Sequence, residues 1–86
     1  MIDRSHNPVE WVCLLAELEK ARARLDTLEA EMIDADGVDE ARFAAYMRQI
    51  YAHLNRAWNA RELTHELSQE EWARFSRFPS DLEPFG

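Results

Sequence analysis

Residues 8–32, PVEWVCLLAELEKARARLDTLEAEM, decide the fold of this chain. Asn7 is a favourable N-cap, Pro8 suits the first helical position, and Glu10 could complete a capping box. Apolar residues then recur at alternating intervals of three and four, the heptad spacing of a helix that packs along another helix. The predicted seam consists of Trp11, Leu14, Leu18, Ala21, Leu25, Leu28 and Met32.

A second long helix is expected after a turn at residues 34–37, where Gly37 is the natural turn residue. Asp39 is a suitable N-cap, and the following apolar residues again alternate by four and three. This second seam consists of Phe43, Met47, Ile50, Leu54 and Ala57, and it is flanked by Tyr46, Tyr51 and Trp58. Because the connection is short, the two helices should be antiparallel neighbours.

A short third helix is predicted over residues 69–76, where Ser68 and Glu71 form a capping box and Pro79 follows the end. The sequence therefore predicts a single all-α domain over residues 1–86. It comprises a hairpin of helices at about 8–34 and 40–62, with the third helix packed at the N-terminal end of the first. Residues 79–86 should be extended, and the second helix could continue through residues 62–67.

The composition narrows the choice of partner and compartment. The chain has 86 residues and a net charge of −7, which disfavours nucleic acid and anionic membranes as partners. A single cysteine, Cys13, excludes an internal disulfide and fits a reducing compartment. No signal peptide or membrane-spanning run is visible, so we expect a cytoplasmic protein.

The apolar face of the second helix is wider than one partner helix would cover. A second copy or another protein should therefore cover the excess, and we expect a homodimer, such as a four-helix bundle. The candidate interaction surface consists of Tyr46, Ile50, Tyr51, Phe78 and Phe85.

No motif predicts a metal, a cofactor or catalysis. The acidic turn that starts at Asp34 lacks the oxygen ligands, glycine and glutamate of a calcium loop at the required positions. Glu62 and His65 have the spacing of di-iron ligands, but no inward-facing carboxylates accompany them in the pattern. Cys13 lies in an apolar stretch, where a thiol is usually inert.

These features predict a small protein–protein interaction module or adaptor without enzymatic activity. The alternative is a ligand-binding or enzymatic helical bundle that holds an anionic small molecule near Arg56, Arg61 and His65. A polar pocket at the tryptophan-rich end, near Trp11 and Trp58, would favour the alternative.

Overall fold

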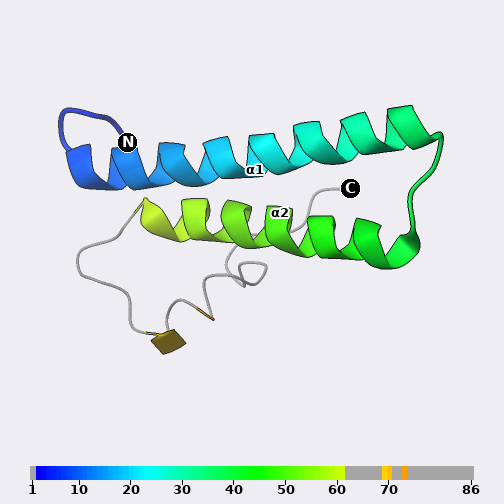
Figure 1. Ribbon diagram of the computed structural model, residues 1–86. Coiled ribbons are helices and arrows are strands. Elements are labelled where there is room, and N and C mark those ends of the chain that lie inside the picture. The colour runs from blue at the N-terminus through cyan, green and yellow to red at the C-terminus, as the bar shows by residue number, and fades with distance from the viewer. Residues whose placement is uncertain (1, 62–68, 71–72, 74–86) are drawn as a thin grey trace, which may run out of the picture.

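The computed structural model describes residues 2–61, 69–70 and 73, and these contain two long helices and no strand. Helix α1 spans Pro8–Ala35 and helix α2 spans Glu40–Ala60. The helices run antiparallel along each other, so the start of α1 and the end of α2 lie at the same end of the hairpin (Figure 1). The predicted all-helical hairpin is therefore confirmed.

The helix ends follow from local sequence, with one difference in how the first is capped. Pro8 opens α1 after Asn7, but the Asn7 side chain makes no capping hydrogen bond. The backbone carbonyl of Asn7 accepts from the Trp11 N–H at 2.8 Å, which is the first hydrogen bond of the helix. Asp39 caps α2 as predicted, because its carboxylate accepts from the Arg42 N–H at 3.3 Å.

The turn between the helices has its left-handed residue at Asp36, next to the predicted turn residue Gly37. Asp36, not Gly37, has a positive φ of 55°, and it ends α1. The Gly37 N–H then donates to the Met32 carbonyl at 3.2 Å, which satisfies one of the last carbonyls of the helix. A short polar side chain such as aspartate tolerates this conformation better than most residues.

The face that α1 turns toward α2 is rotated from the predicted seam. Ala21 and Leu28 are buried, as is Glu17, whereas Leu18 and Leu25 are more than two-fifths exposed. On α2 the buried apolar residues are Ile50, Ala57 and Ala60. The hairpin core is therefore narrow, and it is built largely from small side chains.

The predicted third helix lies mostly outside the described residues. Gln69, Glu70 and Ala73 have helical backbone conformation and are exposed, but the rest of residues 69–76 is not described. The predicted continuation of α2 through 62–67 and the extended tail also lie outside. Trp11 and Trp58 are half-buried, and Trp72 falls among the residues not described.

Candidate functional site

A cluster of ionisable side chains around Glu17 lies largely buried between the two helices. Glu17 of α1 is only 8% exposed, and its Oε2 lies 2.7 Å from Nδ1 of His53 on α2. Nε of Arg56 donates to the same oxygen at 3.3 Å. Nη2 of Arg56 is also 2.9 Å from His53 Nδ1, and Lys20 Nζ is 3.9 Å from the other carboxylate oxygen. Glu17 thus serves as the common anion for three basic groups.

A second polar cluster lies nearer the turn. The carboxylate of Glu31 accepts two hydrogen bonds from the Arg42 guanidinium, at 2.7 and 2.6 Å, and a third from the Tyr46 hydroxyl at 3.0 Å. The Arg42 hydrogen bonds, followed by the bond from Tyr46, lower the pKa of Glu31 from its ordinary 4.5 to about 2. Glu31 in turn raises the pKa of Arg42. The carboxylate therefore stays ionised at any physiological pH.

The two clusters belong to one row of polar side chains along a single edge of the hairpin. Glu17, Arg24 and Glu31 recur every seven residues on α1, while Arg56, Gln49 and Arg42 recur every seven on α2 in the opposite direction. Glu17 pairs with Arg56 at one end of this row, and Glu31 pairs with Arg42 at the other. We call these six residues the polar edge.

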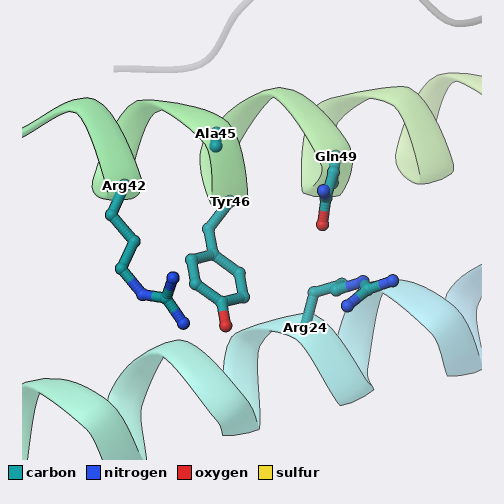
Figure 2. A pocket seen from close by; sticks show the side chains of 5 residues that line it. All are labelled: Arg24, Arg42, Ala45, Tyr46 and Gln49. Atoms are coloured by element: carbon teal, nitrogen blue, oxygen red, sulfur yellow. The ribbon is translucent and has the colours of Figure 1, made fainter.

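An open pocket of about 180 Å³ occupies the middle of the polar edge. Figure 2 shows Gln49 pointing from α2 toward Arg24, whose side chain extends along α1, and Arg42, Tyr46 and Ala45 complete the lining. Within the described part of the chain, no acidic group pairs with Arg24. The pocket has the chemistry to accept a carboxylate, but Glu31 already occupies the Arg42 side of it.

The opposite edge of the hairpin is apolar and exposed. Leu18, Leu25 and Met32 each follow a polar-edge residue by one position, which is about 100° around the helix. They are 42%, 48% and 37% exposed. Leu54 of α2, at 43%, and Phe43, at the turn end, extend the strip onto the second helix. We call these five residues the apolar edge.

The described residues of the predicted interaction surface differ in how exposed they are. Ile50 is buried, Tyr46 is half-buried with its hydroxyl bound to Glu31, and Tyr51 is 48% exposed. Phe78 and Phe85 lie outside the described residues.

The residues of the predicted anion site make contacts within the chain. Arg56 donates to Glu17, and Arg61 lies with its guanidinium carbon 3.6 Å from the Trp58 ring centroid. Arg61 Nη1 also donates to the Trp58 carbonyl at 2.7 Å, while His65 lies outside the described residues. These contacts direct both guanidinium groups toward protein atoms, and the anion site stays a prediction.

Asn55 is the most deeply buried polar residue of the described part, at 1% exposure. The Asn59 amide donates to the Asn55 side-chain oxygen at 3.0 Å and to its carbonyl at 2.8 Å. Neither Asn55 nor the Glu17 cluster was predicted from the sequence. For Glu17, the available signal was the seven-residue spacing of opposite charges on the two helices.

Among residues 2–61, 69–70 and 73, no group of three or more histidine, cysteine or acidic side chains could hold a metal ion. The helices of the same part of the chain include none with the length and apolar character to cross a bilayer.

The chain was compared with models of known protein families, with characterised proteins and with solved structures, and none of the three comparisons gives a match. The class of protein therefore rests on its architecture: an antiparallel helical hairpin with one polar edge and one apolar edge.

Proposed function

We propose that this protein is a small helical interaction module or adaptor without catalytic activity, and that it forms a homodimer. The apolar edge carries this proposal. Contiguous exposed apolar surface in a soluble chain is typical of an interface with another protein. Leu18, Leu25 and Leu54 are each more than two-fifths exposed, whereas the polar edge is held within the hairpin by ion pairs.

The proposed interface includes the apolar edge and Tyr51 of the predicted surface, while Phe78 and Phe85 stay predictions. Ile50 and Tyr46 contribute instead to packing within the hairpin, since Ile50 is buried and Tyr46 is bound to Glu31. The protein is expected to act in the cytoplasm, because Cys13 is a lone free thiol and fits a reducing compartment.

Light scattering at micromolar concentration tests the proposed dimer. The wild-type chain should have twice its monomer mass of 10.1 kDa. Leu25→Glu places a charge in the interface and should give a monomer with unchanged helix content. Ala23→Glu, at an exposed position on the outer face of α1, is the matched control and should leave the dimer intact. A wild-type chain that is monomeric would contradict the homodimer, and affinity purification would then test for a different protein partner.

A further inference from the structure

One cation and one anion border the apolar edge on the outer side of α1. Arg22 and Glu29 follow Leu18 and Leu25 by four residues each, so they lie one turn further along the helix and away from α2. Both side chains are exposed. Within the described residues, neither takes part in an ion pair.

This order of side chains is complementary to itself under two-fold rotation. If two α1 helices cross antiparallel with Leu25 at the axis, each Leu18 meets Met32 of the second copy, because both lie seven residues from the centre. Arg22 precedes the centre by three residues and Glu29 follows it by four, so opposite charges meet twice across the interface. Parallel pairing would bring like charges together instead.

The apolar edge is small for an interface. From Leu18 to Met32, α1 rises by about 21 Å, and two helices side by side are about 20 Å wide. The edge of each copy would therefore cover about 400 Å², about half of what each partner buries in a standard interface.

We infer that a second copy of this chain covers the apolar edge, antiparallel to the first, about a two-fold axis at Leu25. The inference rests on the proposed homodimer and specifies its geometry. The Leu18–Met32 contacts supply apolar burial. The two Arg22–Glu29 contacts select the antiparallel orientation, because complementary charges set register more than affinity.

Cysteine cross-linking tests the axis in the full chain. With Cys13 replaced by serine, Leu25→Cys should give a disulfide-linked dimer under mild oxidation, because a residue on a two-fold axis meets its own copy. Ala23→Cys, on the outer face of the same helix, is the matched control and should remain largely unlinked.

Charge reversal tests the pairing independently of any cysteine. Arg22→Glu and Glu29→Arg should each raise the dimer Kd by about tenfold, since each replaces two attractive contacts by two repulsive ones. The double variant should restore the wild-type Kd. These two residues are seven apart on one helix and cannot pair within a copy, so restoration requires contact between copies.

A dimer that fails to cross-link at position 25, or is not restored by the double reversal, would overturn this geometry and leave the proposed homodimer standing. A chain that stays monomeric at high micromolar concentration would overturn both. The apolar edge would then be covered by another part of the same chain or by a different protein.

Discussion

The carboxylate of Glu17 lies 2.7 Å from Nδ1 of His53, and this contact joins residues that are 36 positions apart in the chain. The two side chains are only 11% and 14% exposed. Removing one member of a buried charged cluster leaves the others desolvated without compensation, which costs more than an exposed pair contributes. The contact therefore fixes how the helices align along their length.

Replacement of Glu17 by alanine should lower the free energy of unfolding by about 3 kcal/mol, since His53 and Arg56 would lose their common anion. Urea denaturation followed by circular dichroism measures this change. Glu19→Ala, at an exposed position two residues away, should change stability by less than about 0.5 kcal/mol. Equal effects of the two substitutions would show that the buried cluster has no special role.

Acid should weaken the hairpin through Glu31. The folded-state pKa of Glu31 is lowered to about 2, whereas its ordinary value is 4.5. The stabilisation is therefore fully present above about 4.5 and is lost as the pH falls from there toward 2. Denaturation at a series of pH values should show this loss in the wild type and a smaller slope in Glu31→Gln. Glu29→Gln should keep the wild-type slope, and a Glu31 pKa near 4.5 by NMR titration would contradict the prediction.

Substitution of Asp36 in the turn should raise the stability of the hairpin, whereas substitution of Gly37 should leave it unchanged. Asp36→Gly should raise stability by about 0.5 kcal/mol, because glycine adopts positive φ without steric cost. Gly37→Ala should be neutral within about 0.5 kcal/mol, since an added Cβ meets nothing within 4 Å. Thermal unfolding of both variants distinguishes the two positions. The opposite order of effects would assign the left-handed conformation to Gly37.

The middle of the polar edge offers a site for an added ion pair. Gln49→Glu would set a carboxylate across the pocket from Arg24 and should stabilise the hairpin by about 0.5 kcal/mol. The gain should disappear when Arg24 is also replaced by alanine, and a double-mutant cycle isolates that coupling. A gain that persists without Arg24 would point to a different cause.

The sequence predicted the helices well because their ends carry strong local signals. Pro8 after Asn7 and Asp39 before the second helix are short-range features, and both begin helices in the structure. The usual preference for glycine in turns indicated Gly37 as the turn residue, but it did not indicate which residue would be left-handed. Here Asp36 adopts that conformation.

The rotation of α1 was not predicted, because apolar spacing alone places leucine inside. Leu18 and Glu17 are adjacent, and the structure buries the acid. The basic partners of Glu17 are on the other helix, so its burial depends on how α1 and α2 align. That alignment could be anticipated only by matching charges across the hairpin.

The division of the hairpin into two unlike edges limits the size of any assembly. Within the described residues, ion pairs close one edge of the hairpin, and the apolar edge on the other side stays open for association. A chain with one self-complementary interface forms a closed dimer, because each copy has no second interface for a further copy. Such a chain should stop at a finite complex and should not grow into filaments as its concentration rises.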